Sequence, residues 1–233
     1  MEIAVTIDLD DTLIETQDDY TEAREWFAEY VSQRYATVTK ADATEIQTDC
    51  SRDLLSEYGL SVERYPNACL VALETLVDNP SEEERQRVFE IGASAMKEEF
   101  QYANRGFREN AEELISVSNA VSDFSVLLTA GDNSVQNRKV NALDLADKFD
   151  SVEITEMDGK SDFLRSLSNS FDKVVHIGNS FSSDVQAALD ANVSCIYVPQ
   201  KEWREGEQDA KYDDVQYAEN ITEAISLVEE LGT

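Results

Sequence analysis

Short runs of β-branched and apolar residues alternate with helical patterns along this chain, and that alternation constrains the fold more than any other feature. The runs lie at residues 2–7, 124–128, 152–155, 173–177 and 194–198, with the third the weakest. Strands that alternate with helices need crossover connections, which favour parallel pairing with helices on both faces. The sequence therefore predicts an α/β fold built on a doubly wound parallel sheet.

A long helical block separates the first predicted strand from the second. Residues 15–104 carry apolar side chains every three or four positions and contain no convincing strand. We therefore expect an all-helical domain of residues 15–104, inserted into an α/β domain of residues 1–14 and 105–233. The polar stretch 200–218 is expected to be a surface excursion from the α/β domain.

Helix boundaries within the block carry recognisable signals. Thr16 is expected to cap the first helix, and Ser81 with Glu84 has the spacing of a capping box. Gly59 is expected to end a helix, because glycine tolerates the left-handed conformation common at that position.

The charge balance is strongly acidic. The chain has 49 acidic and 19 basic residues, which gives a formal net charge of −30. Such a surface repels nucleic acid and anionic lipid, so neither is an expected partner. The three cysteines are far apart and there is one histidine, which argues against a zinc site. With no leader-like or membrane-spanning apolar run, the protein is expected to be soluble and cytoplasmic.

Polar clusters follow three of the predicted strands at the point where each strand ends. Asp8, Asp10 and Thr12 follow the first strand, Thr129 opens the second cluster, and the third cluster occupies residues 178–184. The carboxyl ends of parallel strands meet at one edge of the sheet, where ligands bind in open α/β folds. We therefore expect these side chains to converge.

The order of these clusters resembles the motif order of the haloacid dehalogenase superfamily of hydrolases. The matching residues are Asp8, Asp10 and Thr12 in the first motif, Thr129 in the second, Lys160 in the third, and Gly178, Asn179, Ser180 and Asp184 in the fourth. The family usually has Asp where this chain has Asn179, and this form looks like a phosphatase-type branch. The helical block is similar to the family's cap domain in position and helicity only, while the α/β part is similar to its Rossmann-like core.

The resemblance implies a mechanism for hydrolysing phosphate monoesters. Asp8 would attack phosphorus and become an aspartyl phosphate, while Asp10 would protonate the leaving oxygen and then activate water. Phosphoryl oxygens would be held by Thr129, Ala130 and Lys160.

Magnesium is the cofactor that this resemblance implies. Crowded carboxylates cannot all remain ionised without a cation, and hard oxygen ligands suit Mg²⁺. The expected metal-binding residues are Asp8, Asp10 through its main-chain carbonyl, Asp184 and Asn179. Asn179 puts the affinity for Mg²⁺ in question, because an amide is a weaker ligand than a carboxylate.

Three further polar residues are weighed against these roles. Lys139 competes with Lys160, but it is set aside because it falls inside a predicted helix and too early in the motif order. His176 lies inside a predicted strand and is expected to be buried and structural. Asp132 either orients a neighbouring site residue or caps the next helix.

The sequence therefore predicts a Mg²⁺-dependent hydrolase of a small phosphorylated metabolite, with its oligomeric state left open. A haloacid dehalogenase is one alternative, although its halide leaving group would not need Asp10. A phosphoryl-accepting receiver domain is another, but its acceptor aspartate ends a later strand and it has no long insertion. A non-catalytic binding or scaffold protein remains a third, because of Asn179.

The net charge also predicts a halophilic protein from a salt-rich cytoplasm. Repulsion among like charges should loosen the fold at low salt, and molar salt should remove it because the Debye length falls to about 3 Å. The melting temperature should therefore rise through a KCl series. A melting temperature that is independent of KCl would contradict this interpretation.

Overall fold

The computed structural model describes residues 1–96, 106–199 and 212–232. The chain divides into two compact units, which we call the α/β unit (residues 1–15 and 102–233) and the helical unit (residues 16–101). The second domain boundary that the sequence predicts, at residues 104 and 105, lies outside the described residues. Across the described ranges, no helix combines the length and apolar character needed to cross a bilayer.

A six-stranded parallel sheet forms the centre of the α/β unit. Its strands are β1 (Ile3–Ile7), β2 (Phe124–Ala130), β3 (Ser151–Thr155), β4 (Lys173–Gly178), β5 (Ser194–Tyr197) and β6 (Val215–Tyr217). They lie in the order β3-β2-β1-β4-β5-β6, and every neighbouring pair is parallel. The reversal of strand order on either side of β1 confirms the doubly wound α/β fold, and it makes β1 and β4 neighbours at the switch point.

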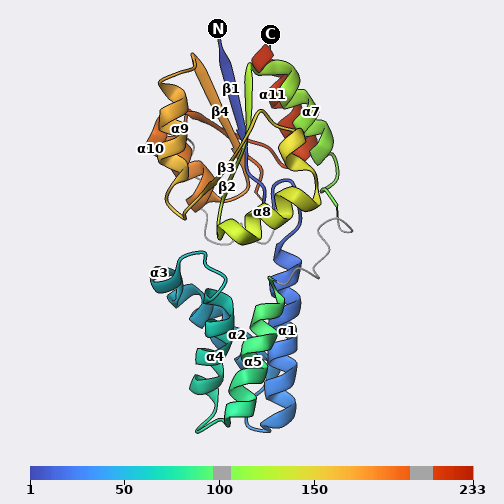
Figure 1. Ribbon diagram of the computed structural model, residues 1–233, viewed down its shortest axis with the longest axis vertical. Coiled ribbons are helices and arrows are strands. Elements are labelled where there is room, and N and C mark those ends of the chain that lie inside the picture. The colour runs from blue at the N-terminus through green and yellow to red at the C-terminus, as the bar shows by residue number, and fades with distance from the viewer. Residues whose placement is uncertain (97–105, 200–211, 233) are drawn as a thin grey trace. The chain divides into compact units, whose positions relative to one another are not determined.

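Helices cover both faces of this sheet (Figure 1). They are α7 (Ala111–Val121), α8 (Asn133–Ala142), α9 (Lys160–Ser168), α10 (Gln186–Ala191) and α11 (Ile221–Glu229). Ile3, Val5 and Ile7 of β1 pack in one apolar cluster with side chains of α7 and α11. Ala4 belongs to a second cluster with α9 and α10. The two-residue alternation of a strand therefore gives β1 a buried face on each side.

The edge strand β6 was not predicted. Its residues lie in the stretch 200–218, which we expected to be a surface excursion, yet Val215–Tyr217 pairs in parallel with β5. Three residues are too few for an alternating pattern to stand out, and an edge strand is only partly buried. Residues 200–211 of the same stretch lie outside the described part.

The described elements of the helical unit are all helices, as the sequence predicts. They are α1 (Gln17–Arg34), α2 (Lys40–Asp53), α3 (Leu55–Tyr58), α4 (Arg64–Leu76) and α5 (Glu82–Ser94). The apolar faces of α1, α2, α4 and α5 meet in one buried cluster that includes Phe27, Val31, Cys69, Leu73 and Val88. The helical period of the sequence accounts for this cluster, because residues three or four apart share one face.

The three predicted helix boundaries lie where the sequence placed them, because Thr16 directly precedes α1, Gly59 directly follows α3 and Ser81 directly precedes α5. Ser81 and Glu84 form a complete capping box at the start of α5. Gly59 follows α3 with a φ of 56°, in a conformation that favours glycine. Thr16 precedes α1 but makes no capping hydrogen bond through its side chain. Its ψ of −24° differs from the extended ψ of 161° that aims the Ser81 hydroxyl at its helix.

Glu84 joins the end of α1 to the start of α5. One carboxylate oxygen accepts hydrogen bonds of 2.7 Å from both the main-chain N–H and the hydroxyl of Ser81. The other oxygen accepts from the Tyr35 hydroxyl at 2.5 Å and is paired with Arg34. Hydrogen bonds from Tyr35, Arg34 and Ser81 lower the pKa of this carboxyl to about 2.

This carboxylate should make the stability of the helical unit sensitive to acid. A pKa lowered from 4.5 means that the folded state gains from ionised Glu84 above about pH 4.5 and loses that gain as the pH falls toward 2. Glu84→Gln should lower the melting temperature at about pH 7, and its difference from the wild type should shrink at about pH 3. Glu83→Gln, at an exposed position of the same helix, is the matched control. If the difference in melting temperature between wild type and Glu84→Gln did not depend on pH, the charge of the Glu84 carboxylate would contribute nothing to stability.

Candidate active site

The predicted site residues lie at the carboxyl edge of the sheet. Asp8 directly follows β1, Thr129 and Ala130 end β2, and Asn179 directly follows β4. Ile7 is paired with both Leu127 of β2 and Ile177 of β4, so the three strand ends stand side by side. The parallel register therefore brings the first, second and fourth motifs together.

Lys160 lies at the centre of the arrangement. It is the first residue of α9, its side chain is 2% exposed, and its ammonium is 2.6 Å from Asp8 Oδ1 and 2.6 Å from Asp184 Oδ1. Because one nitrogen contacts both oxygens, the two carboxylates are close neighbours despite their separation in sequence. The structure thus joins the third motif to the first and fourth through a single buried ammonium.

Burial and neighbouring charges shift the pKa values of Asp8, Asp184 and Lys160 in different directions. Burial raises the pKa of Asp8 to about 7, although the Lys160 ammonium opposes the change. Burial also acts on Asp184, but there Lys160 and a hydrogen bond from His176 outweigh it and lower the pKa. The pKa of Lys160 is raised, because the Asp184 and Asp8 carboxylates outweigh the effect of its burial. Asp184 and Lys160 therefore form a stable ion pair beside a nucleophile candidate that titrates near neutrality.

His176 contacts Asp184 through a ring nitrogen. It is fully buried in β4, as predicted, with Nδ1 2.7 Å from the Thr6 hydroxyl and Nε2 3.1 Å from Asp184 Oδ1. Burial lowers the pKa of His176, so the ring is neutral near pH 7. A carboxylate can only accept, which places the ring hydrogen on Nε2 and leaves Nδ1 to accept from Thr6. The contact with Asp184 was not predicted.

Gly178 and Ser180 complete the setting of Asp184. The main-chain N–H of Ser180 donates to Asp184 Oδ2 at 2.9 Å. A Cβ atom on Gly178 would lie 2.3 Å from Asp184 Cγ, so a side chain at this position would displace the carboxylate. The glycine of the fourth motif is thus required by a close approach rather than by a turn.

Thr12 links the nucleophile candidate to Asn179. Its Oγ1 is 3.1 Å from Asp8 Oδ2 and 3.1 Å from Asn179 Oδ1. A hydroxyl has one hydrogen, so it can donate to only one of these two acceptors at a time. An Asp8 carboxylate oxygen and the Asn179 amide oxygen therefore both lie within hydrogen-bonding distance of the Thr12 hydroxyl.

The second acid of the first motif has two partners in α8 that the sequence analysis did not assign to it. Lys139 Nζ is 2.7 Å and 2.9 Å from the two carboxylate oxygens of Asp10, and Gln136 Nε2 is 2.9 Å from Asp10 Oδ2. Lys139 was set aside as the lysine of the third motif, and its contact with Asp10 is a different role, which the sequence analysis did not consider. Gln136 and Lys139 are three residues apart in α8, a spacing that puts both on one helix face and could have indicated a shared partner.

The second motif is tied into the same group of contacts. Gln136 Nε2 donates to Thr129 Oγ1 at 2.5 Å, and Thr129 is fully buried. Asp132 accepts from the main-chain N–H groups of Ser134 and Val135, at 2.9 Å and 3.3 Å, and so caps α8. Of the two roles considered for Asp132, helix capping is the one that the structure shows.

The oxygen ligands of the site suit a hard cation, but the described side chains are not arranged as a metal-binding group. Asp8, Asp184 and Asn179 offer carboxylate and amide oxygens of the kind that Mg²⁺ prefers. Among the residues that the structure describes, no three or more His, Cys, Asp or Glu side chains are grouped so as to hold a metal. Lys160 lies between Asp8 and Asp184 instead. The metal-binding roles therefore stay predictions.

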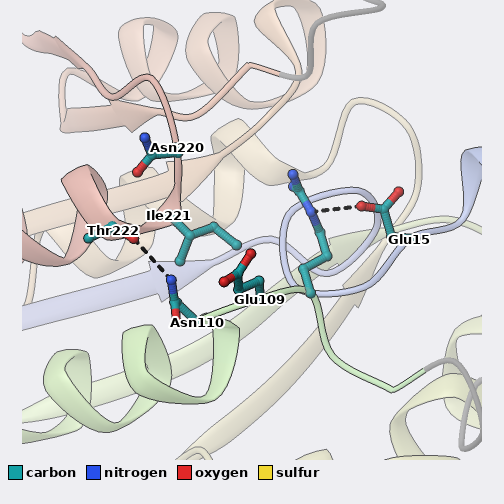
Figure 2. A pocket seen from close by; sticks show the side chains of 7 residues that line it. Glu15, Glu109, Asn110, Asn220, Ile221 and Thr222 are labelled. Atoms are coloured by element: carbon teal, nitrogen blue, oxygen red, sulfur yellow. Dashed lines mark hydrogen bonds and ion pairs between the residues drawn. The ribbon is translucent and has the colours of Figure 1, made fainter.

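A separate hollow of about 480 Å³ lies beside the loop that follows β1 (Figure 2). It is lined by Glu15, Arg108, Glu109, Asn110, Asn220, Ile221 and Thr222. Arg108 pairs with Glu15 at 3.2 Å and donates to the main-chain carbonyl of Asp11. No predicted site residue lines this hollow, but Arg108 anchors the loop that carries the first motif.

Comparison with known proteins supports the fold and leaves the chemistry open. No model of a known protein family matches the sequence. No curated protein matches it either.

Solved structures are similar over nearly the whole chain. A haloacid dehalogenase-like family hydrolase from Xanthomonas campestris is 22% identical, with a TM-score of 0.77 over 99% of this chain and 92% of that chain. A HAD phosphatase from Thermococcus onnurineus and an L-2-haloacid dehalogenase from Xanthobacter autotrophicus are each 17% identical. Their TM-scores are 0.57 and 0.58, and each match covers 98% of both chains. The resemblance that the motifs indicated is thus confirmed at the level of architecture: this chain has the fold of the haloacid dehalogenase-like hydrolases.

Proposed function

We propose that this protein hydrolyses phosphate monoesters of small molecules through an aspartyl phosphate on Asp8. The observation that carries the proposal is the contact of one buried ammonium, Lys160, with Asp8 and Asp184 at the carboxyl edge of the sheet. A second acid, Asp10, lies two residues from the nucleophile candidate, and the Thr129 hydroxyl lies at the end of the neighbouring strand.

In the first step, a carboxylate oxygen of Asp8 forms a bond to phosphorus while the bond from phosphorus to the ester oxygen breaks. The leaving oxygen takes a proton from Asp10 and departs as an alcohol. Thr12 and Lys160 already contact the two oxygens of Asp8, one each, and so fix the plane of its carboxylate. Lys160 also offsets negative charge where the phosphoryl group must approach.

In the second step, water attacks phosphorus of the aspartyl phosphate and gives up a proton to Asp10. The bond from phosphorus to Asp8 breaks, which releases inorganic phosphate and restores both aspartates. The side chain of Asp10 is 28% exposed, whereas that of Asp8 is 7% exposed. The more accessible carboxyl is therefore the one assigned to exchange protons with the leaving group and with water.

Magnesium is part of the proposal on the chemistry of the donor set. Asp8, Asn179, Asp184 and the main-chain carbonyl of Asp10 would hold it, and the bound cation would supply positive charge against the anionic phosphoryl group. Asp8 and Asn179 already flank one hydroxyl, that of Thr12. The HAD-hydrolase YfnB from Bacillus subtilis, a solved structure with a TM-score of 0.65 to this chain, was determined bound to magnesium.

A dehalogenase is the second candidate, because L-2-haloacid dehalogenases are among the structurally similar proteins. The contact of Lys160 with Asp8 would serve either reaction, since both need an oriented carboxylate nucleophile. Asp10 favours the phosphatase, because a halide leaves without a proton whereas an alkoxide requires one.

Replacement of the nucleophile tests the proposal directly. Asp8→Asn should reduce phosphate release from p-nitrophenyl phosphate, assayed with MgCl₂ in concentrated KCl, by about 10³-fold or more. Asp162→Asn is the matched control, since this exposed aspartate pairs with the surface residue Arg165. Equal activity in wild type and Asp8→Asn would refute the mechanism. Chloride release from 2-chloropropionate by the wild type, without phosphatase activity, would establish the dehalogenase instead.

Removal of magnesium should abolish phosphate release. EDTA should stop the reaction and added MgCl₂ should restore it, because the phosphoryl group would otherwise meet uncompensated carboxylates. KCl is held constant and in large excess, so that a change in charge screening cannot mimic the effect. As a readout independent of activity, MgCl₂ should raise the melting temperature of the wild type more than that of Asn179→Ala. Full activity in EDTA would remove magnesium from the proposal.

A further inference from the structure

We propose that Lys139 and Gln136 of α8 are positioning residues for Asp10, and that they affect the reaction only through that carboxyl group. The inference rests on the proposed function and adds two residues to it. Neither belongs to the motifs that the sequence analysis identified.

Lys139 is placed as a partner of Asp10 rather than as a surface lysine. Its side chain is 6% exposed, and its ammonium contacts both oxygens of Asp10, at 2.7 Å and 2.9 Å. Burial of an ammonium is costly unless it is paired and hydrogen-bonded. The position of Lys139 is therefore stable because Asp10 is there, and the orientation of Asp10 is fixed in turn.

Gln136 fixes the same carboxyl from a second direction. Its side-chain amide lies 2.9 Å from Asp10 Oδ2, 2.5 Å from Thr129 Oγ1 and 3.5 Å from the main-chain carbonyl of Ala130, and its two hydrogens can serve two of these acceptors at a time. The amide thus connects the acid assigned to proton transfer with the hydroxyl assigned to phosphate. A Cβ atom on Gly131, whose φ is 153°, would lie 3.2 Å from Gln136 Cδ, so the glycine leaves room for this contact.

Two contacts are needed because Asp10 would otherwise be free to rotate. Its side chain is the more exposed of the two aspartates in the first motif. Proton transfer requires the donor within hydrogen-bonding reach of the leaving oxygen, and a carboxyl that samples several rotamers meets this condition only part of the time. With donors on both oxygens, the carboxylate form of Asp10, which takes the proton of water in the second step, is held in one plane and one orientation.

The two buried lysines of the site therefore have separate roles. Lys160 contacts Asp8 and Asp184, whereas Lys139 contacts Asp10. If Lys139 bound the phosphoryl group itself, its loss would weaken substrate binding. If it acts through Asp10, its loss should slow the step that needs a proton and leave binding nearly unchanged.

A double-mutant cycle with two substrates distinguishes these cases. Wild type, Lys139→Met, Asp10→Asn and the double variant are assayed on β-glycerophosphate, whose alkoxide needs a proton, and on p-nitrophenyl phosphate, whose phenolate does not. Lys139→Met should lower kcat on β-glycerophosphate by about 10–100-fold, with KM changed less than about twofold and a smaller loss on p-nitrophenyl phosphate. When Asp10→Asn is already present, adding Lys139→Met should cause no further loss of kcat.

Controls separate positioning from a general effect on stability. Lys148→Met removes a lysine that is paired with Glu112 outside the site, and it should leave kcat and KM unchanged. Lys139→Arg should recover part of the lost kcat, because a guanidinium can also contact both carboxylate oxygens. If Lys139→Met does not fold, Gln136→Met is taken through the same cycle and should show the same dependence on the leaving group.

Three results would overturn the inference while the proposed function stood. They are a loss of kcat that persists in the Asp10→Asn background, a rise in KM that persists in that background, and no loss at all in Lys139→Met. Failure of the proposed function looks different: the wild type would release no phosphate from either substrate, or Asp8→Asn would release as much. That outcome overturns both proposals.

Discussion

The site depends on one ammonium buried between two carboxylates. Lys160 can remain charged at a buried position because Asp8 and Asp184 contact it, and its ammonium favours the ionised form of both carboxylates. The arrangement needs the parallel order of β1 and β4, the start of α9 at the same edge, and a glycine at position 178. His176 and the main-chain N–H of Ser180 donate further hydrogen bonds to the Asp184 carboxylate. A change in any of these elements would leave a buried charge without its partner, so the sheet and the site are mutually dependent.

A second ion pair, Lys139 with Asp10, gives the same edge two carboxyl groups in different surroundings. Asp8 is deeply buried and its pKa is raised by that burial, while Asp10 is more exposed and held from α8. Different environments allow two aspartates of one short motif to take different chemical roles. Three carboxylates meet two ammonium groups here, and the remaining negative charge is consistent with the proposed need for a cation. These local cations also contrast with a chain whose net charge is −30.

Much of the architecture was predictable because it follows from local patterns. The buried runs of β1, β2, β4 and β5 are apolar and β-branched, and the capping box of Ser81 and Glu84 depends on neighbours three residues apart. The convergence of Asp8, Thr129 and Asn179 was also predictable, because parallel strands end at one edge. The strand β6 was missed, since three residues carry too little pattern. Thr16 stands at the start of α1 as predicted, but its side chain makes no capping hydrogen bond, because that bond depends on a backbone angle that the residue type does not set.

The sequence by itself determined the alternation of strands and helices and the residues at the carboxyl edge of the sheet. Only the tertiary structure decided which lysine contacts which aspartate. Asp10 and Lys139 are 129 positions apart, and Asp8 and Lys160 are 152 positions apart. Their pairing is set by the register of the strands and by the rotation of α8 and α9 about their axes. Both are fixed by packing against the sheet, because the apolar face that a helix buries fixes where its polar side chains point.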